Sequence, residues 1–311
     1  RDFAIPGQSW AKAERASAPL MGLLSEDFLK VSEGIVGTCQ DIEISYVRIT
    51  SHPDPKTVRP EPVLRLALAK VKERERRGRD YEECQDLYMS ICQDLRLQQL
   101  HGQLAVEVRE GFAQCAMRAR TGVRKSMDVK ALSDSLLHLH ALYLEHPGQP
   151  RELEFALYRM LLWLALAQEG DEQQTGWVRL APAVEALHPH RVNGLVKHGM
   201  GVLAAVSEGD VVGYFAHVHA TPADAVEARN IYDTMLSPVM RMRGYKAVLK
   251  AYKMQIPCRA LQRRLGLPSP GAVAEWVTAQ GAVLVGHGEE AALDVDESRK
   301  ASPPAAQEAP A

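Results

Sequence analysis

The sequence predicts a mainly α-helical protein, in which a TPR-like α-solenoid of paired helices precedes a small C-terminal unit of three helices and a β-hairpin. Apolar residues recur at helical spacing along most of the chain from about residue 57 onward. The turns between these segments are short, which favours antiparallel helix pairs, although no fixed consensus repeat is visible. After residue 236 the segments become shorter and end in two extended runs.

The helices expected in the stack follow one another with few interruptions. The first opens at Thr57-Val58-Arg59-Pro60 and continues through Val71. The strongly apolar segment Leu153–Gln168 is expected at the centre of the stack. Thr221-Pro222-Ala223-Asp224 is typical of a helix start, with a cap residue, a proline at the first position and an acid in the first turn. The other helices are expected near Asp80–Leu97, Gln103–Ala119, Asp128–Glu145, Trp177–Leu187, Arg191–Ser207, Val211–His219 and Pro222–Leu236.

The C-terminal unit begins with a helix whose apolar residues are spaced i, i+3, i+4 and i+7, from Tyr245 to Tyr252. Ile256-Pro257 ends this helix, and Cys258, Leu261 and Leu265 are expected to face inward in the next one. Ser269 can cap a third helix that starts at Pro270. Two extended runs follow, Ala282–Val285 and Ala291–Val295, and three helices followed by a hairpin describe a winged helix.

The stretch Thr234–Ala274 contains eight cations and no acid, whereas the other residues carry a formal net charge of −10, because the whole chain has −2. A positive field concentrated in one segment attracts phosphate backbones or an acidic protein partner. Three of the cations, at positions 246, 250 and 253, are expected to form one stripe along their helix. The candidate nucleic-acid-binding residues are Arg241, Arg243, Lys246, Lys250, Lys253, Arg259, Arg263 and Arg264.

The plainer interpretation of this basic stretch is a solvated surface that keeps the protein soluble. The absence of interspersed acids argues against it, because surfaces built for solubility mix both signs of charge. In helix-turn-helix DNA readers the second helix of the pair supplies the base contacts. Here that helix, Pro270–Gln280, carries Glu275 and no cation. We therefore expect contact with phosphates without readout of bases.

Other residue patterns favour no site. The basic run Lys70–Arg79 is typical of a solvated helix end, since two glutamates dilute its charge.

The sequence contains no GxSxG, HExxH, P-loop or GxGxxG pattern, so no catalytic residue is expected, and a catalytic role would have to depend on Cys39. The histidine pairs have i, i+2 spacing, which places two rings on different faces of a helix, so neither a metal nor a cofactor is expected. These pairs are His138/His140, His188/His190 and His217/His219.

No apolar run approaches the ~20 residues that a membrane-spanning helix needs, and no signal peptide is expected. The five cysteines are scattered and form no CxxC pair, so we expect reduced thiols in an intracellular protein.

A string of residues near the N-terminus carries a family resemblance. It consists of Val36-Gly37-Thr38-Cys39-Gln40-Asp41, Tyr46, Arg48, Thr50, Pro53-Asp54-Pro55, Thr57-Val58-Arg59-Pro60, Val63-Leu64, Tyr81, Gln85, Met89-Ser90-Ile91, Gln93-Asp94-Leu95 and Val106-Glu107-Val108. With these residues the chain resembles the SAC/GANP family of PCI-domain proteins, over about Val36–Leu267. Glu43-Ile44 stands where GANP proteins proper carry a second Cys-Pro, which favours the branch of leukocyte receptor cluster member eight and the Thp-type factors.

The resemblance implies a PCI domain, in which a helical stack is fused to a winged helix. It also implies a non-enzymatic nuclear scaffold that acts in transcription-coupled mRNA processing, including splicing, and in mRNA export. Such a scaffold would bind the RNA or DNA phosphate backbone, a second PCI-domain subunit and a small acidic DSS-type protein. The alternative is a protein-interaction subunit of a proteasome-lid-like or signalosome-like assembly, whose cations meet acidic protein and not nucleic acid.

The expected organisation has four parts. Residues 1–35 are an extended lead-in with a short helix near Ser25–Ser32, and residues 36–236 form the helical stack. Residues 237–296 form the winged helix. Residues 297–311 are an Ala/Pro/Ser-rich tail that cannot bury a core and is expected to be disordered.

Overall fold

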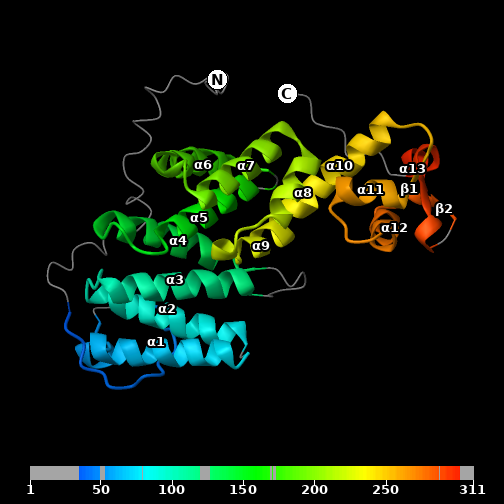
Figure 1. Ribbon diagram of the computed structural model, residues 1–311. Helices are drawn as coiled ribbons and strands as arrows, with labels where there is room; N and C mark the ends of the chain where they lie inside the picture. The colour runs from blue at the N-terminus through cyan, green and yellow to red at the C-terminus, as the bar shows by residue number, and fades with distance from the viewer. Residues whose placement is uncertain are drawn as a thin grey trace.

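The computed structural model is mostly helical (Figure 1). It describes residues 35–49, 53–78, 80–119, 127–168, 170, 173–286 and 288–301. The predicted lead-in, including the helix near Ser25–Ser32, therefore lies outside the described residues except for residue 35, and so does the end of the predicted tail.

Helices α1 to α8 form the stack. From α1 to α6 each helix packs on the next, whereas α7 packs on α5 and on α8. One continuous apolar core runs through these layers, and the Trp163 side chain on α5 is almost completely buried within it. The helices are α1 (Glu61–Arg76), α2 (Tyr81–Leu97), α3 (Gln103–Arg118), α4 (Val129–Glu145), α5 (Glu152–Leu166), α6 (Gln173–Leu187), α7 (Gly194–Glu208) and α8 (Val211–His219).

Several of these helices begin where a short polar side chain caps the first turn. The carboxylate of Asp128 accepts a hydrogen bond from the backbone N–H of Ala131 at the start of α4. Asn193 and Asp210 cap α7 and α8 in the same way. Such caps satisfy backbone donors that have no partner within the helix, which explains why these helix starts are visible in the sequence.

The segment predicted as a single helix from Pro222 to Leu236 is divided. A short 3₁₀ turn is followed by α9 (Ala228–Ile231) and then by a π-helical turn over Tyr232–Leu236, which continues into α10 (Ser237–Ala251). The π turn lies directly before Pro238, which cannot donate a backbone hydrogen bond and crowds the preceding turn. This proline explains why the regular helical pattern is interrupted there.

The C-terminal unit follows α10 and has its own apolar core. Three short strands form an antiparallel sheet in the order β1-β3-β2, so that Leu293 of β3 lies opposite Ile256 on one side and Leu284 on the other. Figure 1 shows this unit at the end of the protein, next to α8, the last helix of the stack, and to α10. Its elements are β1 (Gln255–Pro257), α11 (Cys258–Leu265), α12 (Pro270–Ala279), β2 (Val283–Val285), β3 (Ala292–Asp294) and α13 (Val295–Ala301).

Two elements of this unit differ from the sequence-based expectation. Strand β1 was expected only as the end of a helix, because its partner strand lies more than 30 residues away in the sequence. Helix α13 continues to Ala301 within the region expected to be a disordered tail. It is held in place by Ser298, which is buried and bonds to the backbone of Val283, and by Arg299, whose guanidinium donates to the carbonyl oxygens of Leu249 and Tyr252.

Candidate nucleic-acid interface

Two of the eight predicted cations are used for contacts inside the protein. The Nε of Arg241 donates to the carbonyl oxygen of Leu265, at 2.7 Å. Its guanidinium also lies over the rings of Phe215 and Trp276, at 5.6 and 5.9 Å from their centroids. Burial lowers the pKa of Arg241 below its usual range. This residue therefore joins α8, α11 and α12.

Arg243 makes a second connection between α10 and the stack. Its guanidinium donates to the amide oxygen of Gln168, at 2.8 Å, and to the carbonyl oxygen of Val206, at 3.2 Å. Both acceptors belong to the part of the stack formed by α5 and α7. Because both terminal nitrogens of its guanidinium already donate to acceptors within the protein, Arg243 has less capacity left for a phosphate.

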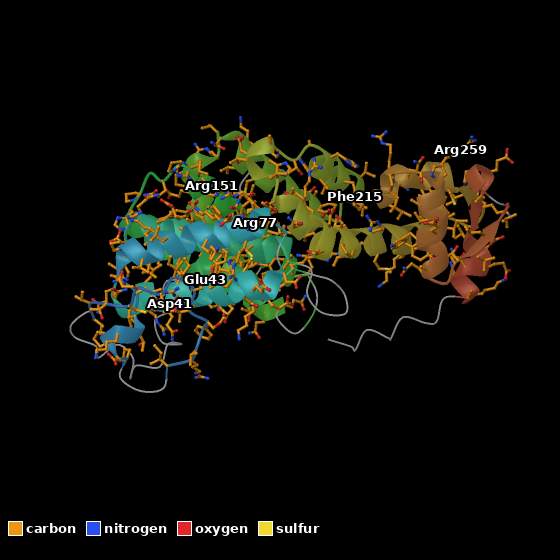
Figure 2. All side chains as sticks on the ribbon, turned by 90° about the horizontal axis from the view of Figure 1, so that it is seen from below. Asp41, Glu43, Arg77, Arg151, Phe215 and Arg259 are labelled. Carbon is orange, nitrogen blue, oxygen red and sulfur yellow. The ribbon has the colours of Figure 1, made fainter. Side chains whose placement is uncertain are left out.

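The other six predicted cations are exposed, and three of them lie on α11. Cys258, Leu261 and Leu265 bury the inner face of this helix, so Arg259 and Arg263, at i and i+4, share its outer face. Figure 2 shows Arg259 projecting from the end of the protein that lies opposite Asp41 and Glu43.

The third arginine on this helix, Arg264, holds its guanidinium 5.6 Å from the ring centroid of Tyr252. Arg259, Arg263 and Arg264 constitute what we call the α11 arginine surface. None of them has a carboxylate within ion-pair distance in the described part of the chain.

The lysines lie on another side of the unit. Gly244 marks the position where α11 approaches α10, because a Cβ at Gly244 would lie 3.0 Å from the carbonyl oxygen of Arg264. Lys246 and Lys250 are about 200° and 240° further round α10 from Gly244. Lys253 lies beyond the end of the helix, in the connection to β1. The structure therefore places Arg259 and Arg263 on one face of α11 and Arg264 about 100° further round the same helix, against Tyr252, and it does not bring all eight cations onto one face.

The helix that would read bases in a helix-turn-helix protein carries no cation. On α12, Glu275 is exposed, and the side chain of Trp276 is turned toward Tyr245, with the two rings at 5.6 Å and nearly perpendicular. An exposed carboxylate repels phosphate, so α12 is unsuited to enter a groove of a nucleic acid.

Residues of the family-like motifs meet in a buried contact at the other end of the protein. The side chain of Arg59 is fully buried, and its Nε donates to Asp94 Oδ2 at 2.6 Å. The remaining guanidinium nitrogens donate to the Ser90 hydroxyl and, at 3.0 Å, to the carbonyl oxygen of Ile42. This contact, the Arg59–Asp94 lock, fastens the extended segment around Ile42 onto α2.

A second pair of motif residues supports the start of α4. The Tyr81 hydroxyl and the Gln85 amide both donate to Asp128 Oδ2, at 3.0 and 2.9 Å, while Oδ1 of the same carboxylate caps α4. Burial and the Asp128 charge raise the pKa of Tyr81, so its hydroxyl remains a neutral donor. These motif residues stabilise the stack.

Among the described residues no cluster of three or more histidines, cysteines or carboxylates has the arrangement of a metal site. In the same part of the chain no helix combines the length and the apolarity required to span a bilayer.

The sequence profile of the SAC3/GANP family matches residues 45–285. The chain belongs to the SAC3/GANP family. This membership agrees with the resemblance carried by the motif residues, several of which form the Arg59–Asp94 lock.

Relatives of this SAC3/GANP protein include SAC3 family protein A of Arabidopsis thaliana, which is 31% identical over 78% of the chain and 22% of that protein. A THP3 homologue of Schizosaccharomyces pombe is 29% identical over 58% of the chain and 42% of its own length. The leukocyte receptor cluster member 8 homologue of Xenopus laevis is 35% identical over 44% of the chain and 16% of its own length. The chain thus spans less than half the length of each of these relatives.

Proposed function

We propose that this SAC3/GANP protein is a non-enzymatic nuclear scaffold of mRNA processing and export, which contacts the phosphate backbone of RNA through the α11 arginine surface. The observation that carries the proposal is the group formed by Arg259, Arg263 and Arg264, three exposed guanidinium groups without a carboxylate partner among the described residues. Guanidinium groups bind phosphate in a bidentate manner, and three of them on one short helix can follow a nucleic-acid strand.

The architecture that supports this role is a PCI domain. In this interpretation α1 to α9 are a degenerate helical-repeat solenoid, and α10 to α12 with the three-stranded sheet are a winged helix. The exposed Glu275 on α12 is consistent with sequence-independent contact to phosphates. A second PCI-domain subunit and a small acidic DSS-type protein are the partners proposed for the rest of the surface.

The first test is the salt dependence of RNA binding. If three phosphates are contacted on a single strand, the logarithm of the association constant should fall with the logarithm of salt concentration with a slope of about −2. Affinity should then weaken roughly 20-fold between about 50 and 200 mM salt. Fluorescence anisotropy of a labelled single-stranded RNA with the purified chain measures this slope, and a slope near zero would contradict the proposal.

Three charge-matched triple variants show which surface is responsible. Arg259, Arg263 and Arg264 changed to glutamate should abolish most of the RNA binding, because repulsion replaces attraction along α11. The same change at Lys246, Lys250 and Lys253 should weaken binding less, since Lys246 and Lys250 lie on the side of α10 away from α11 and Lys253 lies in the connection to β1. The control variant changes three exposed cations outside the C-terminal unit to glutamate, namely Arg191, Lys197 and Arg229. Its net charge changes by the same amount as that of the other two variants.

The same variants test the alternative, a protein-interaction subunit without nucleic-acid binding. It would be favoured if the α11 variant kept its RNA affinity and lost partner proteins in a pull-down. Equal loss of RNA binding in all three variants would indicate a response to net charge alone and would contradict a dedicated arginine surface.

A further inference from the structure

A pocket of about 190 Å³ opens between α4, α5 and α6. Its walls are mostly apolar, with Leu136, Leu139 and Phe155 among the residues that line it. Leu144, 71% exposed, stands at its mouth. The pocket lies in the helical stack, and it has no part in the cationic surfaces of α10 and α11.

The unusual residue in this pocket is Arg159 on α5. Arg159 is buried, with only 6% of its surface exposed. Its guanidinium nevertheless makes no hydrogen bond or ion pair with any described residue. Its Nε is completely buried without a partner. Burial lowers the pKa of Arg159 to about 10, so it remains charged at neutral pH. A buried charge without a counter-ion is costly, and proteins usually avoid it.

The polar neighbours of Arg159 do not supply a counter-ion. The Tyr143 hydroxyl donates to Glu110, at 2.8 Å, and Oε2 of Glu152 accepts from the backbone N–H of Gly148, at 3.1 Å. His140 also lines the pocket, and burial together with the Arg159 charge lowers its pKa to about 4, so its ring is neutral at physiological pH. The pocket therefore presents the Arg159 guanidinium among mainly apolar walls, and the one carboxylate that lines it, Glu152, is turned to the backbone N–H of Gly148.

We propose that this pocket binds the acidic side chain of a peptide segment of a partner protein, with the carboxylate against Arg159 and a neighbouring apolar side chain against Leu144. A carboxylate carries a single negative charge, which one guanidinium neutralises with two parallel hydrogen bonds. A phosphate dianion would leave an excess negative charge in apolar surroundings, and it has no apolar portion to contact the leucines.

The surroundings offer room for the rest of such a peptide. A second hollow of about 410 Å³ shares Glu152, Leu153 and His190 with the pocket and continues toward Asn193. Glu154 and Asp224 also line this hollow, so a peptide whose acidic side chain enters the pocket can extend along the loops before α5 and α7 with uncharged or basic residues there. This inference goes beyond the proposed function and does not depend on RNA binding.

The test uses the full chain and two capped dipeptides, acetyl-Glu-Leu-amide and acetyl-Gln-Leu-amide, which differ only in the charge of the first side chain. Saturation-transfer difference NMR follows the titration of each. We expect the glutamate probe to bind about tenfold or more tightly than the glutamine probe, because it forms charge-assisted hydrogen bonds. Absence of saturable binding, equal affinity of the two probes or tighter binding of inorganic phosphate would each overturn the proposal.

Substitutions assign the preference to Arg159. The Arg159→Met variant should lose the difference between the probes while keeping or raising its melting temperature, since it removes an unpaired buried charge. Arg159→Lys should retain a weaker preference for the glutamate probe, and Arg191→Met, at a nearby exposed cation, should behave as the wild type. A preference that persists in Arg159→Met, or that is lost in Arg191→Met, would overturn the proposal.

Discussion

Replacing Arg59 by alanine is expected to destabilise the protein by about 3–5 kcal/mol, because it leaves Asp94 buried without its counter-ion. Burial raises the pKa of the Asp94 carboxyl, whereas Arg59 acts in the opposite direction. Without the guanidinium, the carboxyl would have to bind a proton or draw water into α2. The carbonyl oxygen of Ile42 and the Ser90 hydroxyl lose their donors at the same time.

Urea unfolding followed by circular dichroism measures this loss. Arg65→Ala is the matched control, since Arg65 forms an exposed ion pair with Glu61 and should cost no more than about 1 kcal/mol. Changing both partners of the lock, Arg59 to Met and Asp94 to Leu, should be less destabilising than Arg59→Ala, because no unpaired charge remains. If Arg59→Ala unfolds at nearly the wild-type urea concentration, the lock does not contribute as argued.

This buried contact explains what the motif residues do. In the sequence they form a recognisable string, and nothing in their spacing shows that Arg59 and Asp94 touch, because 35 residues separate them. The segment around Ile42 has no periodic pattern because it is extended and is held by individual hydrogen bonds rather than by a helical face. The motif residues therefore indicate the family from the sequence alone. The hydrogen bond between Arg59 and Asp94 is visible only in the structure.

Local signals predicted most helix boundaries, whereas long-range contacts determine the elements that were missed. Ser269 caps α12 and Pro270 opens it, as the sequence predicts, because capping depends on neighbouring residues alone. Strand β1 exists because Ile256 pairs with Leu293, and α13 is ordered because Ser298 bonds to Val283. Short segments of this kind have no periodicity that a single sequence can reveal.

The same limit applies to the charged residues. A count of cations does not distinguish Arg241 and Arg243 from Arg259, because the carbonyl and amide oxygens that engage the first two come from residues far along the chain. Arg159 lies in a strongly apolar helical segment, and its sequence position does not show that its buried Nε has no partner, because that depends on residues from other helices.

The junction between the stack and the C-terminal unit gives the second large expected effect. Gly266 follows α11 with a φ of +60°, and a Cβ at this position would overlap the ring of Phe215. Figure 2 shows Phe215 between the stack and the unit that carries Arg259. Gly266→Ala should destabilise the protein by about 2–4 kcal/mol, through left-handed backbone strain and displacement of the ring. Phe215→Ala should cost about 3–5 kcal/mol, because it empties a packed site.

A double-mutant cycle separates these two causes. Once the Phe215 ring is absent, Gly266→Ala meets no overlap, and only the backbone term of about 1 kcal/mol should remain. The double variant should therefore be more stable than the sum of the single variants predicts, with a coupling of about 1–3 kcal/mol measured by urea unfolding. Additive losses would mean that α8 and α11 do not meet at this contact in solution. Arg241 lies over the Phe215 ring and donates to the carbonyl oxygen of Leu265. Both of these contacts depend on α8 and α11 lying close together, so they would then be absent as well.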